Sequence, residues 1–119
     1  MSVKARTIKE GKIGIVEIKG SLIGDKDTDD FRATVTDLVE QGNKSLVIDL
    51  HKVNYMNSSG IGAIIAVHSS YSKNGGLVKL AGLSNNVQSL FVATKLITIF
   101  DVFDTIDQAV ESFNNPKTN

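Results

Sequence analysis

Residues 45–62 read SLVIDLHKVNYMNSSGIG, and the periodicity of this stretch changes halfway along it. Its first part, 45–50, is a short run of mostly apolar, β-branched residues, which is typical of a strand buried on both faces of a parallel sheet. From Ser59 onward the apolar residues recur at helical spacing. The stretch therefore predicts a central parallel strand, a loop over 51–60 and a helix that begins at the serines, which together form one βα unit.

The rest of the chain alternates between the same two patterns. Strand-like and helix-like segments follow in the order β-β-α-β-α-β-α-β-α, with Glu10-Gly11 as the turn of an initial hairpin. This order predicts an α/β domain with a mixed, mostly parallel sheet of about five strands, about four helices and right-handed crossovers. The expected strands lie within 2–22 (two strands), 45–50, 77–83 and 97–103, and the expected helices within 24–43, 59–76, 84–95 and 105–113.

Capping signals mark the ends of several of these helices. Asp27 predicts the start of the first helix, and Gly42 predicts its end. Ser84 predicts the cap of the third helix, and Thr105 with Gln108 forms a capping box for the fourth. The buried face of the second helix is expected to consist of Ile61, Ile64, Ile65 and His68.

Length and composition indicate one globular domain. The chain has 119 residues, of which 41% are hydrophobic and 22% charged, and both fractions are ordinary for a folded soluble protein. We assign 1–113 to the domain. The last six residues, 114–119, are polar and contain the chain's sole proline, so we expect them to form a disordered tail.

Charge and residue content exclude several functional classes. Thirteen Lys and Arg balance thirteen Asp and Glu, so the basic excess of a nucleic-acid-binding protein is missing. The absence of cysteine and the two isolated histidines argue against a disulfide framework and a metal site. No segment resembles a signal peptide or is long and apolar enough to span a bilayer. We therefore expect a cytoplasmic protein without cofactor or metal, which binds no nucleic acid and does not insert into the membrane.

A catalytic role for the serines would need a general base. Ser58 and Ser59 are candidate nucleophiles, and the candidate bases are His51 and His68. We expect His68 to be a satisfied, half-buried histidine and His51 to lie in an exposed loop. The G-x-S-x-G pattern of hydrolases and the glycine-rich phosphate loops are absent. From the residues alone, NSSG at 57–60 is a helix cap in a binding module, and we expect no enzymatic activity.

The central stretch also carries a recognisable family pattern. It consists of Val47-Ile48-Asp49-Leu50, Val53, Tyr55-Met56 and Ser58-Ser59-Gly60-Ile61-Gly62. This pattern resembles the core signature of STAS domains, most closely that of the stand-alone anti-sigma factor antagonists of bacteria. The likeness continues through the Gly-Gly strand, the Leu-Phe helix and the final strand and helix, so it covers nearly the whole chain. The resemblance implies the STAS fold.

The resemblance also implies a function in transcription regulation. In this family an antagonist binds an anti-sigma factor that is also a serine kinase, and binding frees the sigma factor. The kinase phosphorylates the antagonist, which abolishes binding, and a PP2C-type phosphatase removes the phosphate. By motif match the phosphoacceptor is Ser58, with Ser59 as the next candidate.

We expect the partner to bind around the two serines and along a second face of their helix, where small residues allow close approach. The chain has Asn57 where the family has Asp, and Gly20-Ser21-Leu22-Ile23 where it has Gly-Glu-Leu-Asp, with Asp25 as the nearest carboxylate. These departures support an alternative function, a STAS module that docks without phosphorylation in a transporter, lipid-trafficking or sensory complex. The expected partner-binding residues are Ser21, Asp25, Asn57, Ser58, Ser59, Gly60, Gly62, Ala66, Ser69, Ser70 and Lys73.

Overall fold

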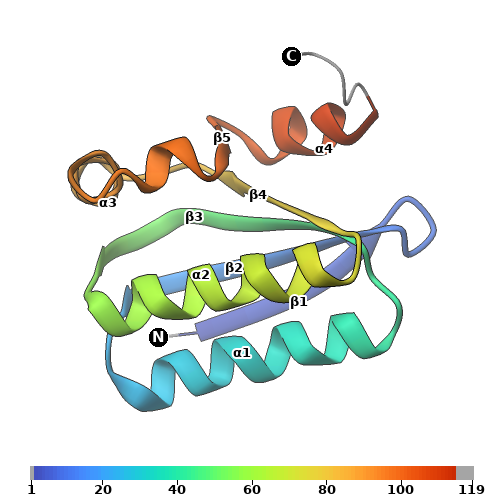
Figure 1. Ribbon diagram of the computed structural model, residues 1–119, viewed down its shortest axis with the longest axis horizontal. Coiled ribbons are helices and arrows are strands. Elements are labelled where there is room, and N and C mark those ends of the chain that lie inside the picture. Colours follow the sequence, from blue (N-terminus) through green and yellow to red (C-terminus); the bar gives the residue numbers. More distant parts are fainter. Residues whose placement is uncertain (1, 115–119) are drawn as a thin grey trace.

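The computed structural model describes residues 2–114, apart from the side chain of Asp25, and Figure 1 shows their arrangement. The predicted order of elements is confirmed. The strands are β1 (Ser2–Ile8), β2 (Ile13–Leu22), β3 (Ser45–Met56), β4 (Leu77–Ala81) and β5 (Asp101–Phe103), and the helices are α1 (Gly24–Glu40), α2 (Ser58–Lys73), α3 (Asn85–Ala93), the short 3₁₀ helix η1 (Leu96–Thr98) and α4 (Ile106–Asn114). Asn114, which we assigned to the tail, is therefore helical, and the rest of the predicted tail lies outside the described residues.

The sheet is mixed and mostly parallel, as the sequence predicts. Its strand order is β1-β2-β3-β4-β5, with β1 antiparallel to β2 and every later pair parallel. The carboxyl ends of β2, β3 and β4 therefore meet at one edge, where α1, α2 and α3 begin. In open α/β sheets this is the edge at which binding sites form.

The helices are divided unequally between the two faces of the sheet. The larger core lies under α1, α2, α3 and η1, and it contains the fully buried Phe31, Ile64 and Phe91. On the other face α4 packs Ala109 and Val110 against the sheet. The first half of β3, in the middle of the sheet, is buried on both faces, which confirms the prediction of a central buried strand.

β3 is much longer than the sequence predicted. The prediction of a loop over 51–60 is wrong, because β3 continues to Met56 and stays paired with β2 as far as Leu22. Val53 and Met56 are buried on this extension, and two register shifts in the pairing with β2 accommodate its length. Only Asn57 separates β3 from α2, so the serines follow directly at the edge of the sheet.

α1 begins earlier than predicted, although it ends where expected. Its N-cap is Ile23, which provides no side-chain hydrogen bond, and Asp27 lies within the helix. Gly24 has a φ of +80°, which glycine adopts without strain, so the chain turns directly from β2 into the helix. At the other end, Gln41 is the C-cap and Gly42 follows with a φ of +89°, as the sequence predicts.

The caps predicted for the third and fourth helices are confirmed. Ser84 Oγ accepts a hydrogen bond from the Val87 N–H at 3.3 Å. Thr105 Oγ1 accepts from the Gln108 N–H at 3.0 Å. The reciprocal bond is displaced by one residue, because Gln108 Oε1 accepts from the N–H of Asp104, at 3.2 Å, rather than from that of Thr105.

Burial of Tyr71 gives this fold a measurable pH dependence. Its hydroxyl donates to Asn43 Oδ1 at 2.7 Å, and burial raises the pKa of Tyr71 to about 12. The folded state therefore holds the phenol proton more tightly than the unfolded chain, in which tyrosine titrates near pH ~10. Stabilisation by neutral Tyr71 is complete below about pH 10 and is lost as the pH rises toward the folded pKa.

We test this with Tyr55→Phe, which leaves Tyr71 as the only tyrosine. In the folded variant the phenolate absorbance should appear only above about pH 11, whereas in denaturant it should appear near pH ~10. Coincident titrations of the folded and unfolded protein would contradict the burial argument.

Candidate functional site

α2 begins at the carboxyl edge of the sheet, with Asn57 as its N-cap. The Asn57 Oδ1 accepts from the Gly60 N–H at 3.2 Å, and the Asn57 carbonyl accepts from the Ile61 N–H at 2.9 Å. The cap expected within NSSG is therefore formed by the asparagine and not by a serine. Ser58 and Ser59 are the first two helical residues; both are exposed, and their hydroxyls are not used for capping.

The start of α2 provides a favourable environment for negative charge. The first N–H groups of a helix have no intrahelical acceptor, and here the Asn57 side chain satisfies that of Gly60, while the Asn57 carbonyl begins the helical hydrogen bonds at Ile61. Within the described residues, no hydrogen bond is formed by the N–H of Ser58 or of Ser59. The first turn contains no acidic residue, so the partial positive charge of the helix end is not neutralised locally.

Gly60 sets how closely α2 approaches the end of β2. A Cβ at this position would overlap the carbonyl oxygen of Leu22 and would lie 3.0 Å from the Cβ of Met56. A Cβ on Gly62 would have open space around it. The two glycines of the motif therefore differ. Gly60 is required by packing, whereas Gly62 leaves the outer face of the helix without a side chain one turn after Ser58.

The outer face of α2 extends from Ser58 along the helix. Helical periodicity aligns Ser58 with Gly62, Ile65 and Ser69. Ile65 was expected to be buried, but it is 39% exposed, because it lies on this outer line. His68 is half-buried and Ile61 is also partly covered. The buried face of the helix consists of Gly60, Ala63, Ile64, Val67 and Tyr71.

Of the other residues expected to bind a partner from α2, Gly60 is buried because it packs against the end of β2, whereas those further along the helix are accessible. Ala66, Ser69 and Lys73 are exposed, and Ser70 is half-buried. Ala66 and Ser70 line a hollow of about 210 Å³ between α1 and α2, and Arg32 of α1 lines it too. The small side chains on this part of α2 therefore border a shallow depression.

The end of β2 contributes apolar surface that the sequence did not predict. Ser21 is half-buried and pairs with Tyr55 of β3. Tyr55 is 54% exposed and Ile23 is 40% exposed. Asp25 lies in the first turn of α1, and its side chain is outside the described part of the structure. Two large, exposed side chains with apolar surface therefore lie at the same edge of the sheet as the two serines.

A hollow of about 500 Å³ lies between the end of β3 and α3. It is lined by Tyr55, Met56, Asn86, Val87, Ser89 and Leu90. Sequence patterns could not reveal it, because the segment around Tyr55 was expected to be a loop. The hollow places concave, partly apolar surface one residue away from the Asn57 cap.

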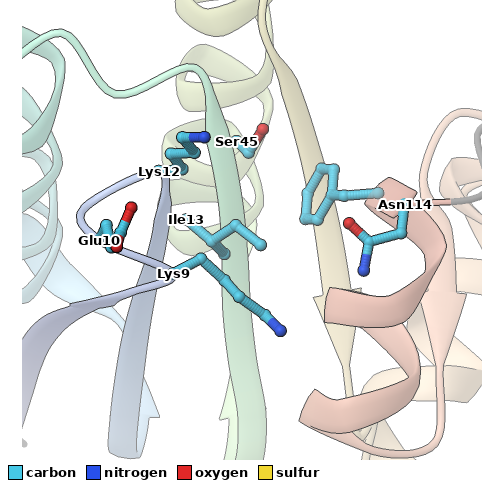
Figure 2. A pocket seen from close by; sticks show the side chains of 7 residues that line it. Lys9, Glu10, Lys12, Ile13, Ser45 and Asn114 are labelled. Carbon is cyan, nitrogen blue, oxygen red and sulfur yellow. The ribbon is translucent and has the colours of Figure 1, made fainter.

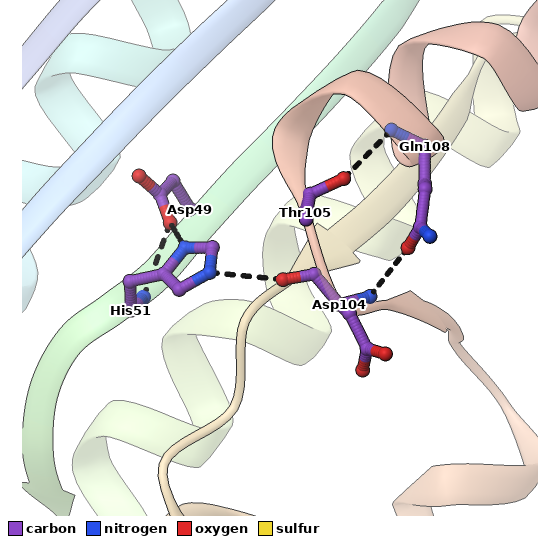
Figure 3. A network of polar contacts seen from close by, with 5 residues as sticks. All are labelled: Asp49, His51, Asp104, Thr105 and Gln108. Atoms are coloured by element: carbon purple, nitrogen blue, oxygen red, sulfur yellow. Dashed lines mark hydrogen bonds and ion pairs between the residues drawn. The ribbon is translucent and has the colours of Figure 1, made fainter.

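Neither histidine is placed as a general base for the serines. His51, expected in a loop, lies in β3; its Nδ1 is 2.6 Å from Asp49 Oδ1 and its Nε2 is 2.9 Å from the carbonyl oxygen of Asp104 (Figure 3). His68 is half-buried, as expected, with its ring against Phe100, and the ring centroids are 5.0 Å apart. It is not satisfied, since its buried Nδ1 has no hydrogen-bond partner in residues 2–114. The hydrogen-bond and ring contacts described for both histidines are thus made with residues other than Ser58 and Ser59.

A further hollow lies far from this edge of the sheet. It measures about 580 Å³ and lies between the β1–β2 turn and the end of α4, at the amino ends of the parallel strands (Figure 2). Its lining includes Lys9, Lys12 and Phe113 but no residue predicted for the site. Across the same residues, no cluster of three or more His, Asp or Glu side chains is placed to hold a metal ion, and no helix is long and apolar enough to cross a membrane.

A family model of the STAS domain matches residues 4–109. The chain belongs to the STAS domain family. The anti-sigma-B factor antagonist of Bacillus subtilis (strain 168) is 38% identical over 72 residues, a match that covers 60% of this chain. It covers 65% of that relative, slightly under two thirds of its length.

Solved structures of similar proteins confirm the predicted fold. TM1081 from Thermotoga maritima has a TM-score of 0.84 with 22% sequence identity, over 92% of both chains. The anti-sigma factor antagonist SpoIIAA in its unphosphorylated form has a TM-score of 0.80 with 16% identity, over 99% of this chain and 100% of its own. The phosphorylated form of Bacillus SpoIIAA has a TM-score of 0.75 with 16% identity, over 94% of this chain and 99% of its own. This STAS domain therefore shares the five-stranded architecture of anti-sigma factor antagonists.

Proposed function

We propose that this STAS domain is an anti-sigma factor antagonist, which binds an anti-sigma factor with serine kinase activity and so regulates transcription by a sigma factor. The observation that carries the proposal is the position of Ser58. It is the first residue of α2 and it is exposed. The helix is capped by the side chain of Asn57, so the Ser58 hydroxyl is not engaged as a cap. Its hydroxyl is therefore accessible to a kinase, and we propose Ser58 as the phosphoacceptor, with Ser59 as the next candidate.

Phosphate at Ser58 would be compatible with the folded domain. A phosphoseryl group carries about −1.5 to −2 charges and three acceptor oxygens. The N–H groups of Ser58 and Ser59 and the helix dipole all favour an anion at this end of α2. No carboxylate lies in the first turn to repel it. The modification would thus change the charge of the surface while leaving the core intact.

The same phosphate would disrupt a complex. Exposed apolar surface suited to close docking shares the sheet edge and the helix face of Ser58, with Ile23 and Tyr55 at the edge and Ile65 along α2. A partner that covers these side chains removes water from Ser58. A doubly charged group placed there without a counter-charge pays the desolvation cost of a buried, unpaired ion. A PP2C-type phosphatase would restore the binding-competent hydroxyl.

Phosphorylation by the cognate kinase tests the proposal. With ATP and the cognate anti-sigma factor kinase, we expect the native protein to gain about 80 Da, one phosphoryl group. Ser58→Ala should gain nothing, and Ser59→Ala, the matched control one residue along the same exposed turn, should still be modified. Unmodified native protein, or equal modification of Ser58→Ala, would rule out Ser58 as the acceptor.

Asn57 favours a second candidate function, an interaction module that docks without phosphorylation in a transporter, lipid-trafficking or sensory complex. The amide keeps the capping hydrogen bond to Gly60 but provides no carboxylate beside Ser58 for the kinase's magnesium or basic residues. This reading predicts that the partner binds Ser58→Asp as well as the native protein. Both candidates are non-enzymatic and are proposed to act in the cytoplasm.

A further inference from the structure

The second face of the sheet is only partly covered by a helix. α4 packs there chiefly against β3, β4 and β5, while the larger core under α1, α2 and α3 lies on the opposite face. In residues 2–114, no helix therefore lies over β1 and β2 on the side of α4. Neighbouring strands are ~4.8 Å apart, so the uncovered pair is about 10 Å wide, which is the spacing of two helices packed side by side.

Two hollows lie along this uncovered strip. The hollow of about 580 Å³ between the β1–β2 turn and the end of α4 has Ile13 of β2 in its lining (Figure 2). A hollow of about 210 Å³ lies between β1 and the start of α4, and Ile15 of β2 and Ile106 of α4 line it. Ile13 and Ile15 are successive residues on one face of β2. The two hollows therefore form one trough, called here the β2 trough, with an apolar floor on β2 and α4 as one wall.

The wall of the β2 trough opposite α4 is cationic. Lys4 and Arg6 of β1 line the smaller hollow, and Lys9 and Lys12 of the turn line the larger one. All four residues are exposed, and none of them forms an ion pair within the described part of the chain. Figure 2 shows Lys9 extending from the turn toward the side on which Asn114 ends α4. The four positive charges are thus free to pair with a ligand.

The carboxylates of the trough do not cancel this charge. Glu10 lines the larger hollow and Glu17 lines the smaller one, so four cations stand against two carboxylates and an excess of two positive charges remains. The stems of lysine and arginine are aliphatic, so the cationic wall also offers apolar contact below its charged ends. The β2 trough is therefore complementary to a ligand that combines carboxylates with an apolar face.

We propose that the β2 trough is a second docking site, which binds an acidic amphipathic helix of a partner protein. From Ile13 to Glu17 the floor is about 13 Å long, which corresponds to roughly nine residues of a helix. The apolar face of that helix would lie on β2, and its carboxylates would pair with the cations of β1 and the turn. The helix would lie beside α4 and complete the second helical layer of the sheet.

The shape of the trough favours a helix over a larger anionic surface. A helix is about 10–12 Å in diameter with its side chains, so α4 holds a flat membrane surface away from the floor on β2. Duplex DNA is also too broad to enter, since its major groove alone is about 12 Å wide. The balanced charge of the chain adds no long-range attraction for either polyanion.

The β2 trough and Ser58 lie on different parts of the domain. Ser58 begins α2, which packs on the opposite face of the sheet. A helix bound in the trough therefore leaves the Ser58 edge uncovered, and both sites can be occupied at once. The proposal is independent of the function proposed for Ser58, and its test involves no kinase.

Fluorescence anisotropy with a labelled synthetic peptide tests the proposal. The peptide has about 18 residues, enough to form a helix, with leucine along one face and glutamate beside it. We expect the native protein to bind it, and not to bind the same peptide with lysine in place of glutamate. Lys4→Gln combined with Arg6→Gln should weaken binding roughly tenfold, because each exposed charge pair contributes a factor of a few. Glu10→Gln removes a repelling carboxylate and should strengthen binding about twofold.

A matched control separates the trough from net charge. Lys26→Gln combined with Lys95→Gln removes two exposed cations that do not line the trough, so the affinity should stay the same. Nuclear magnetic resonance should show the peptide shifting the amides of Ile15 and Ile106 and not those of α2. Absence of binding, equal losses in the two double variants, or shifts confined to α2 would each overturn the proposal. Urea denaturation confirms that the variants fold.

Other occupants are distinguished in the same buffer. Vesicles of anionic phospholipid and a short DNA duplex should bind more weakly than the acidic peptide, and tighter binding of either would overturn the choice of a helix. α1 carries six acidic residues, so a second copy of the chain is also tested. Self-association of the native protein that is lost in the Lys4→Gln, Arg6→Gln variant would assign the trough to α1 of that copy and overturn the assignment to another protein.

Discussion

Gly60→Ala is expected to lower the free energy of unfolding by about 3 kcal/mol or more, the upper end of the range for overpacked sites. The added methyl group would overlap the Leu22 carbonyl oxygen and crowd the Cβ of Met56. Both obstacles belong to β strands in the centre of the sheet, so neither can rotate away as a flexible side chain would. The start of α2 must shift outward instead, which also separates the Gly60 N–H from its cap on Asn57.

Gly62→Ala provides the matched control for this substitution. It makes the same chemical change two residues further along the same helix, where no atom outside the neighbouring helix backbone lies within 4 Å of the new Cβ. Alanine has the higher helix propensity, so we expect the free energy of unfolding to stay constant or to rise by up to about 1 kcal/mol. Urea denaturation of the two variants measures the difference. Equal effects at the two positions would show that α2 does not pack against β2 as described.

The alternation of patterns along the sequence was sufficient to predict the architecture. Strands such as 45–50 are recognisable because they are buried on both faces, and helices such as α3 and α4 carry local capping signals at Ser84 and Thr105. The errors arose where local signals compete with tertiary pairing. HKVNYM in β3 contains polar residues at exposed positions, so it resembles a loop until its pairing with β2 is known.

The candidate site was predicted in part. The motif resemblance identified Ser58, but the residue types alone could not tell which member of NSSG forms the cap. Ile65 was assigned to the core because periodicity alone cannot tell which of Ile61, Ile64 and Ile65 is the most exposed. The contact of His51 with Asp104 joins residues distant in sequence, and no local pattern predicts it.

Phosphoserine at position 58 is expected to weaken binding of the proposed anti-sigma factor kinase by at least about 100-fold, or roughly 2.7 kcal/mol, within the range for a disrupted buried polar contact. The free energy of unfolding should change by less than about 1 kcal/mol, since the free amides of the first turn and the helix dipole favour the phosphate. Calorimetric titration with protein carrying phosphoserine at this position, together with its urea denaturation, measures both quantities.

Ser69 distinguishes a local effect from the effect of added negative charge. It lies on the same outer line of α2 as Ser58 and is also exposed, but it is three helical turns away from the helix N-terminus. If phosphate acts by burying a charge against the docked partner at the sheet edge, phosphoserine at 69 should weaken binding much less than phosphoserine at 58. If the partner responds only to the total charge of this face, the two modifications should be equivalent, and equal losses of affinity would contradict a switch at Ser58. Ser58→Ala completes the comparison: it removes the phosphoacceptor without adding charge, so it should retain partner binding while the kinase can no longer release it.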